Sequence, residues 1–353
     1  MRSGLAAVLI VGVSLSVQGS PSQAPGQPAT APAPTLRADF LRVIDRPRVA
    51  PEPSAPVRSL QGGYEQELLS FSSESAESVP VLVLKKPGQD GRRPVVIALH
   101  GTGGSKESMR ADLTPYVERG FLGVSLDAPH HGERATAIPG LANPYQSAML
   151  RSYRTGQRHP YLYDTVWDVM RLVDYLVTRS DVDPARIGIV GNSKGGTEAY
   201  LAAAADPRIA VVAPWIGVQS FGWSLRRPAG WEARIWTLRA AVEAAALESR
   251  EAVNAAFVQK FYDRIAPGLV DRFDGPAMLT LIAPRPLLIV NSDSDPRSPL
   301  GGVREAVAAA ERAYAATGSS EKFRFVLQVD AAHEVTPASR EATLEWFERY
   351  LGR

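Results

Sequence analysis

Short apolar runs alternate with amphipathic stretches along most of the chain. The apolar runs predict strands at 64–71, 79–84, 94–99, 122–126, 186–190, 209–213, 286–290 and 323–329. Between and after them, helical spacing or helical composition predicts helices at 105–119, 164–179, 195–205, 302–316 and 337–351. Strands that alternate with helices favour a mostly parallel central sheet flanked by helices, which is the α/β class.

One stretch interrupts this alternation. Residues 220–280 are too long for a simple loop and contain Trp223, Trp231 and Trp236 around an Ala- and Glu-rich middle. We interpret the stretch as a helical insertion that forms a cap over a pocket, with Trp223 as a candidate pocket residue. The alternative is a packing extension distant from any site.

The N-terminus predicts export. Arg2 precedes an apolar run at 5–17, and small-x-small sequences at 17–19 and 22–24 offer cleavage sites, so we assign 1–24 as a signal peptide. The alternative is a buried hydrophobic segment. Residues 25–58 are rich in Pro and Ala and predict a disordered linker, which leaves 59–353 as the catalytic domain. The expected location is secreted or periplasmic, with no integral membrane anchor after cleavage.

Composition removes several classes of function. The chain has 353 residues, 45% of them hydrophobic, and a formal net charge of +2, which argues against a nucleic-acid-binding surface. There is no cysteine, so thiol nucleophiles and thiolate metal sites are excluded. Only five histidines are present, and no H-E-x-x-H zinc motif occurs. The sequence therefore implies neither a metal nor an organic cofactor.

Residues 191–195, GNSKG, form a G-x-S-x-G pentapeptide. The pentapeptide directly follows a predicted strand and directly precedes a predicted helix, which is the setting of a nucleophile elbow. Ser193 is therefore the candidate nucleophile. A serine hydroxyl needs a base to take its proton.

His333 is the only histidine after Ser193, and it follows the last predicted strand by a few residues. Sites in open α/β sheets form at the carboxyl ends of strands, so His333 is the candidate base. The acid is expected on the loop after strand 286–290, where Asp293 and Asp295 are the candidates. We favour Asp295 because Pro296 rigidifies the turn directly after it.

Backbone N–H groups are needed to stabilise the developing oxyanion. Lys194, after the nucleophile, and Thr102, in the loop after strand 94–99, are the candidates, with Gly103 second to Thr102. His130 and His131 follow strand 122–126 and either line the pocket or anchor their loop. The Lys194 ammonium either favours an anionic substrate or oxyanion, or is solvated or salt-bridged.

Five stretches of the chain resemble the α/β-hydrolase superfamily, on the branch of dienelactone-hydrolase-like and prolyl-oligopeptidase-like serine hydrolases. They are HGTGG (100–104), DAPHHGER (127–134), DVDPARIGIVGNSKGG (181–196), IAPRPLLIVNSDSDPRSP (282–299) and the loop around His333. The resemblance implies the α/β-hydrolase fold, with the nucleophile at Ser193, the acid at Asp295 and the base at His333.

We therefore predict a serine hydrolase that cleaves carboxylic esters, either of small molecules or of saccharides, through an acyl-enzyme. One alternative is a prolyl-oligopeptidase-like peptidase, although the residues before the fold are too few for the propeller of those enzymes. The other is a non-catalytic binding protein on the same fold.

Overall fold

The computed structural model describes residues 33–136 and 140–352 of the chain. The strands are β1 (Val57–Gln61), β2 (Tyr64–Glu74), β3 (Glu77–Lys85), β4 (Arg93–Leu99), β5 (Leu122–Leu126), β6 (Val182–Asn192), β7 (Ile209–Trp215), β8 (Leu287–Ser292) and β9 (Phe323–Gln328). The helices are α1 (Ala33–Ile44), α2 (Arg110–Glu118), α3 (Pro144–Thr155), α4 (Tyr163–Leu176), α5 (Lys194–Ala205), α6 (Phe221–Leu225), α7 (Trp231–Ile235), α8 (Arg239–Ser249), α9 (Ala255–Ile265), α10 (Gly275–Met278), α11 (Leu300–Ala316) and α12 (Pro337–Leu351). The predicted signal peptide lies outside the described residues.

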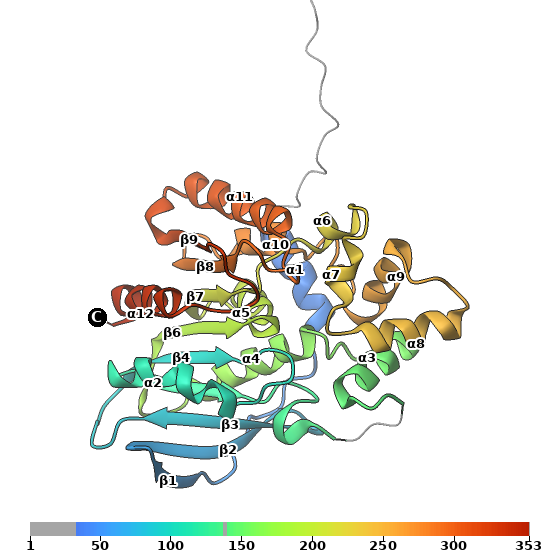
Figure 1. Ribbon diagram of the computed structural model, residues 1–353. Coiled ribbons are helices and arrows are strands. Elements are labelled where there is room, and N and C mark those ends of the chain that lie inside the picture. Colours follow the sequence, from blue (N-terminus) through green and yellow to red (C-terminus); the bar gives the residue numbers. More distant parts are fainter. Residues whose placement is uncertain (1–32, 137–139, 353) are drawn as a thin grey trace, which may run out of the picture. The chain divides into compact units, whose positions relative to one another are not determined.

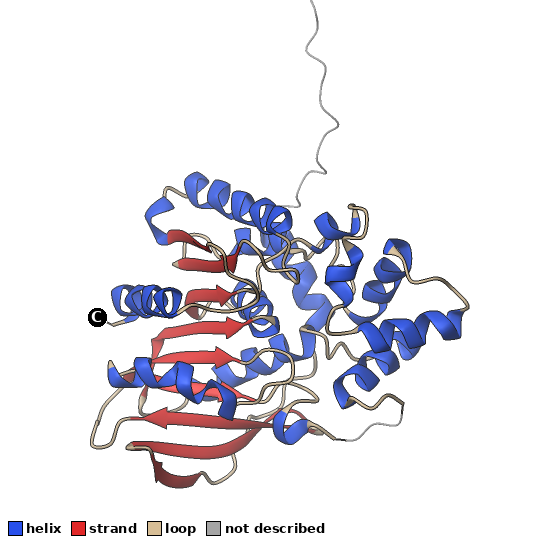
Figure 2. Cartoon of the chain, in the orientation of Figure 1, coloured by secondary structure: helices blue, strands red, loops and turns tan. Residues whose placement is uncertain are grey.

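The strands form one sheet in the order β1-β2-β3-β5-β4-β6-β7-β8-β9 (Figures 1 and 2). The pairs from β5 through β9 are parallel, and the pairs among β1, β2, β3 and β5 are antiparallel. The predicted mostly parallel sheet is thus confirmed. Because the parallel strands point the same way, the loops that follow β4, β6, β8 and β9 meet at one edge.

Side chains that alternate along the strands build a separate core on each face of the sheet. In β4, Val95 and Ile97 belong to one apolar cluster and Val96 belongs to the other. Helices α1, α4, α5 and α11 contribute to the first cluster, and α2 and α12 to the second. The sheet is therefore covered on both faces, which explains why the middle of its central strands, 95–99 in β4 and 187–190 in β6, is apolar throughout.

The prediction of a disordered linker is wrong for residues 33–44, because they form α1. Leu36, Phe40 and Ile44 of this helix are 3%, 0% and 1% exposed and belong to the core. Their spacing of four residues places them on one helical face. The prolines around α1 gave the stretch a linker composition, but none lies between Leu36 and Ile44. The packed chain therefore begins before the predicted start at residue 59.

The stretch at 220–280 is helical and lies between β7 and β8 in the sequence. Helices α6 to α10 occupy it, and Figure 1 shows α6 and α7 beyond the carboxyl ends of the parallel strands. Its buried apolar side chains, among them Phe221, Phe257 and Tyr262, join the core cluster of α4 and α5. No helix within residues 33–136 and 140–352 is long and apolar enough to cross a membrane.

Candidate active site

Ser193 occupies a sharp turn between β6 and α5. Its backbone has φ +56° and ψ −115°, a conformation that costs energy for any residue other than glycine. The flanking glycines make the turn possible. A Cβ on Gly191 would lie 2.1 Å from the carbonyl oxygen of Gly195, and one on Gly195 would lie 2.3 Å from that of Leu99. The geometry explains the G-x-S-x-G spacing.

His333 reaches Ser193 from the loop after β9. Its Nε2 lies 2.7 Å from Ser193 Oγ, and its Nδ1 lies 2.7 Å from Asp295 Oδ2. An ionised carboxylate can only accept, so Nδ1 carries the proton and donates to Asp295. Nε2 is then free to accept the hydroxyl proton of Ser193, as the base of a triad requires.

Asp295 lies on the loop after β8 and is 3% exposed. Its second oxygen, Oδ1, accepts the backbone N–H of Arg297 at 2.8 Å. Asp293 instead braces the loop, because its oxygens accept the Asp330 N–H at 3.2 Å and the Ser294 hydroxyl at 3.0 Å. Of the two candidate acids, the structure brings Asp295 to His333.

Thr102 and Lys194 both line a small pocket that also contains Ser193 and His333. The Thr102 loop packs against the elbow, since a Cβ on Gly101 would lie 3.4 Å from the Ser193 Cβ. The pocket has a volume of about 50 Å³. The two residues that are candidates to stabilise the oxyanion therefore line the same pocket as the nucleophile.

His100 holds the loop of Thr102 in place. Its Nδ1 donates to the Gly101 carbonyl at 2.8 Å, and its Nε2 accepts the Ala128 N–H at 3.1 Å. Burial, reinforced by the Lys194 charge, lowers the pKa of His100 to about 4. The ring is therefore neutral at pH 7, as this pair of hydrogen bonds requires.

The Lys194 ammonium is paired with a buried carboxylate. Its Nζ lies 2.5 Å from Glu198 Oε1, and both side chains are almost fully buried. Burial raises the pKa of Glu198. The salt-bridged alternative is therefore the one that the structure contains.

Two of the three expected pocket residues, His131 and Trp223, pack away from the Ser193 pocket. His131 is buried between the rings of His100 and Tyr145, at centroid distances of 5.1 and 4.6 Å, and thus anchors its loop. Burial lowers its pKa to about 2. Trp223 packs on α11, where its indole would meet a Cβ on Gly301 at 2.2 Å. Neither side chain lines the Ser193 pocket among the described residues.

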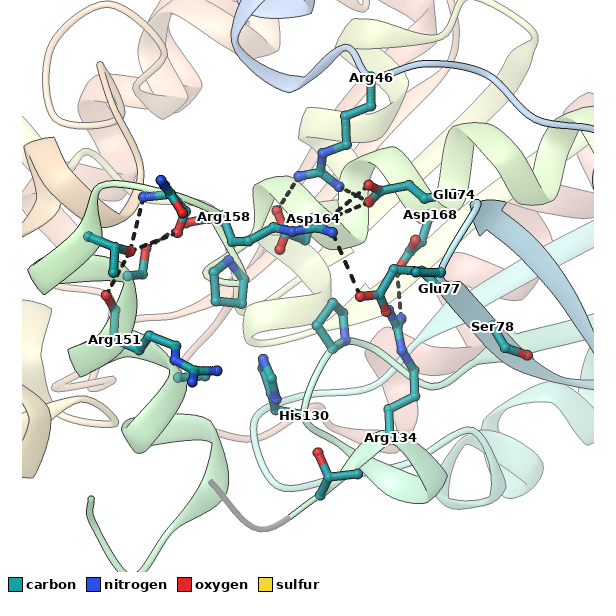
Figure 3. A pocket seen from close by; sticks show the side chains of 18 residues that line it. Arg46, Glu74, Glu77, Ser78, His130, Arg134, Arg151, Arg158, Asp164 and Asp168 are labelled. Carbon is teal, nitrogen blue, oxygen red and sulfur yellow. Dashed lines mark hydrogen bonds and ion pairs between the residues drawn. The ribbon is translucent and has the colours of Figure 1, made fainter. Parts of the chain in front are cut away.

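His130 lines a different and larger cavity, of about 720 Å³ (Figure 3). Ion pairs occupy much of its wall: Arg134 pairs with Asp168 at 2.6 Å, and Arg158 pairs with Glu74 at 2.7 Å. None of the described residues that line this cavity also lines the Ser193 pocket. The pocket role expected for His130 is therefore not supported.

The insertion contributes to the Ser193 pocket through residues that the sequence did not single out for this role. Arg234, Trp236 and Thr237 come from α7 and the turn after it, and Arg297 comes from the loop of the triad acid. No group of three or more His, Asp or Glu side chains suited to a metal ion occurs in the part of the chain that the structure describes.

A hydrogen-bonded serine, histidine and aspartate at the carboxyl edge of this sheet are typical of α/β-hydrolases. Residues 76–318, more than half of the chain, match the model of the family described as "Glucuronyl esterase, fungi". The chain belongs to this family and is a carboxylic ester hydrolase with the α/β-hydrolase fold. The matched range includes Ser193 and Asp295 and ends before His333.

Solved structures share this fold, and a curated sequence is similar over most of the chain. Acetyl xylan esterase 1 from Thermoanaerobacterium sp. superposes with a TM-score of 0.63 at 18% identity, over 90% of this chain and 93% of the other. A glucuronoyl esterase from Solibacter usitatus gives 0.61 at 17%, over 90% and 91%. The provisionally assigned hydrolase YtaP of Bacillus subtilis (strain 168) is 24% identical over 292 residues, 81% of this chain and 88% of the relative.

Proposed function

We propose that Ser193, His333 and Asp295 act as a catalytic triad that hydrolyses carboxylic esters through an acyl-enzyme. The observation that carries the proposal is the hydrogen-bond chain from Ser193 Oγ through both ring nitrogens of His333 to Asp295, with both links at 2.7 Å. A chain of this length and order is what proton transfer from serine to histidine requires.

In the first half-reaction, Ser193 Oγ attacks the ester carbonyl carbon while His333 Nε2 takes the hydroxyl proton. The backbone N–H groups of Thr102 and Lys194 stabilise the resulting oxyanion. The tetrahedral intermediate then collapses, the C–O bond to the alcohol breaks, and His333 returns the proton to the leaving alkoxide. Asp295 stabilises the imidazolium during both transfers.

In the second half-reaction, His333 takes a proton from a water molecule as that water attacks the acyl carbon. Collapse of the second intermediate breaks the bond to Ser193 Oγ, which recovers its proton from His333. The products are the free acid and the free enzyme. No step needs a redox reaction or a metal ion.

We propose a saccharide ester as the substrate class. The description of the family and the names of the two structural neighbours refer to glucuronyl, glucuronoyl and acetyl xylan esterases. Trp236 lines the Ser193 pocket and is 49% exposed, so its ring is available to stack on a sugar. A pocket of about 50 Å³ holds only a few non-hydrogen atoms, so only the part of the substrate next to the ester carbonyl fits inside it.

The test is a panel of nitrophenyl and saccharide esters alongside matched peptide amides. Wild-type protein should cleave esters far faster than amides, and Ser193→Ala should abolish cleavage. Amide cleavage at the rate of activated esters would support the peptidase alternative. Absence of any cleavage by correctly folded protein would support the non-catalytic one.

We also propose that the protein is exported, on the basis of the N-terminal apolar run and the small residues after it. N-terminal sequencing of protein from the native host should find a mature start between Gly19 and Pro25. Retention of Met1 in a cytoplasmic fraction would refute export.

A further inference from the structure

Arg234 is a buried cation at the Ser193 pocket, and its guanidinium forms no ion pair with any residue in 33–136 or 140–352. The residue is 4% exposed, lies on α7, and lines the pocket together with Ser193 and His333. Its Nη2 donates to the Arg297 carbonyl, and its Nε is buried and has no hydrogen-bond partner in the described part of the chain. Buried arginines are normally paired with a carboxylate, so this one is unusual.

The two carboxyl groups that interact with the Arg234 charge, those of Asp274 and Asp295, already have other hydrogen-bond partners. Asp274 accepts the backbone N–H groups of Phe221 and Gly222 at 2.8 and 3.0 Å. Asp295 holds His333. Among the described residues, no Asp or Glu lines the Ser193 pocket. The charge of Arg234 is therefore not balanced from within the pocket, and burial lowers its pKa.

Arg297 adds a second guanidinium to the same wall. It is half-buried, lines the pocket, and lies 5.4 Å from the centroid of the Trp236 ring. The third cation of the pocket, Lys194, is already paired with Glu198 at 2.5 Å. Gln219 also lines the pocket. Two arginines thus line a pocket that has no Asp or Glu among its described residues.

We infer that Arg234 and Arg297 recognise a free carboxylate on the substrate, a few bonds from the ester that Ser193 attacks. This inference rests on the proposed esterase activity and specifies its substrate as an anionic ester. A planar guanidinium matches a carboxylate through paired hydrogen bonds, and burial strengthens that interaction. The carboxylate either terminates the acyl chain, as in a hemi-ester of a dicarboxylic acid, or belongs to the alcohol, as in an acylated uronate.

The experiment compares each anionic ester with a neutral match. The acyl-side pair is the 4-nitrophenyl hemi-ester of glutaric acid and 4-nitrophenyl butyrate. The alcohol-side pair is acetylated methyl glucuronoside, with its carboxylate free, and its carboxamide. The readout is the anionic-to-neutral ratio of kcat/KM within each pair. Wild-type protein should favour the anionic member in one pair, which identifies the side of the ester that carries the charge.

Arg234→Gln should lower that ratio by at least about 30-fold, the lower end of the loss when one partner of a buried, hydrogen-bonded charge pair is removed. Arg234→Lys should restore part of it. The matched control is Arg226→Gln, which changes an exposed arginine that pairs with Glu305 at 3.2 Å outside the pocket. A purely structural Arg234 would change the thermal midpoint and leave the ratio unchanged.

Should Arg234→Gln fail to fold, wild-type protein still provides a test. The free acid of the side that the ratios identify, glutarate for the acyl side or methyl glucuronoside for the alcohol side, should inhibit cleavage of 4-nitrophenyl acetate at a lower concentration than its carboxamide does. Ser193-dependent cleavage with ratios of one or less in both pairs, or equal inhibition by the two compounds, would overturn the inference and leave the esterase intact. Absence of Ser193-dependent cleavage of any ester would instead refute the proposed function.

Discussion

Replacement of Asp295 by asparagine changes one hydrogen-bonding atom and leaves the shape of the site intact. The carboxylate accepts from His333 Nδ1 at 2.7 Å and from the Arg297 N–H at 2.8 Å. The introduced amide can still accept one of these, but its NH₂ group faces the other. If the NH₂ group faces Nδ1, the imidazole must adopt the tautomer with the proton on Nε2. That tautomer cannot take the proton of Ser193.

Asp295→Asn should therefore lower kcat by about 10⁴-fold, as the equivalent change does in other triads. This corresponds to about 5 kcal/mol of transition-state stabilisation. The assay is steady-state hydrolysis of a nitrophenyl ester, with a thermal melt to confirm folding. Asp293→Asn is the matched control, because Asp293 contacts the Asp330 N–H and the Ser294 hydroxyl, and its cost should be less than tenfold. A larger loss of kcat in Asp293→Asn than in Asp295→Asn would refute the reasoning.

Three further predictions concern stability. Gly195→Ala should destabilise the protein by about 3 kcal/mol, since its Cβ would lie 2.3 Å from the Leu99 carbonyl; an unchanged urea midpoint would contradict this. Phe40→Ala, at a fully buried site on α1, should cost about 3–5 kcal/mol in urea unfolding, and a cost below 1 kcal/mol would mean that α1 is not part of the core. Burial holds the pKa of His100 at about 4 against an ordinary 6.5, so the unfolded chain binds a proton that the folded chain does not between these pH values. Lowering the pH from 6.5 to 4 should therefore remove about 3 kcal/mol of stability through His100 alone, and His131, a second buried neutral histidine, should add to this loss. His131→Phe should make the loss smaller, and a stability that rises as the pH falls from 6.5 to 4 would contradict the reasoning.

The sequence was sufficient to predict the three residues that the structure brings together. Ser193 is marked by glycines that the turn needs, and His333 by being the only histidine after it. Both predictions depend on local steric limits and on the rule that parallel strands end at one edge. The distinction between Asp293 and Asp295 depended only on Pro296, and the structure is what brings Asp295 to the histidine.

The pocket wall was harder to predict. Trp223 and Trp236 both lie in the helical insertion, but Trp223 packs on α11 and Trp236 lines the Ser193 pocket. Which face of a short helix meets a pocket is decided by tertiary packing, and five-residue helices are too short for a reliable periodicity. Nothing in the local sequence distinguishes Arg234 from the exposed arginines near it. The helix α1 was missed for a related reason, because its three core residues lie within a proline-rich stretch.

The central claim is that Ser193 is a nucleophile activated by His333, and covalent trapping tests it most directly. Native protein is treated with a labelled fluorophosphonate, and the modified peptide is identified by mass spectrometry. We predict stoichiometric labelling of Ser193 in the wild type, strongly slowed labelling in His333→Ala, and none in Ser193→Ala. Stoichiometric labelling of a different serine in folded Ser193→Ala protein, or no labelling of a folded wild type, would contradict the account.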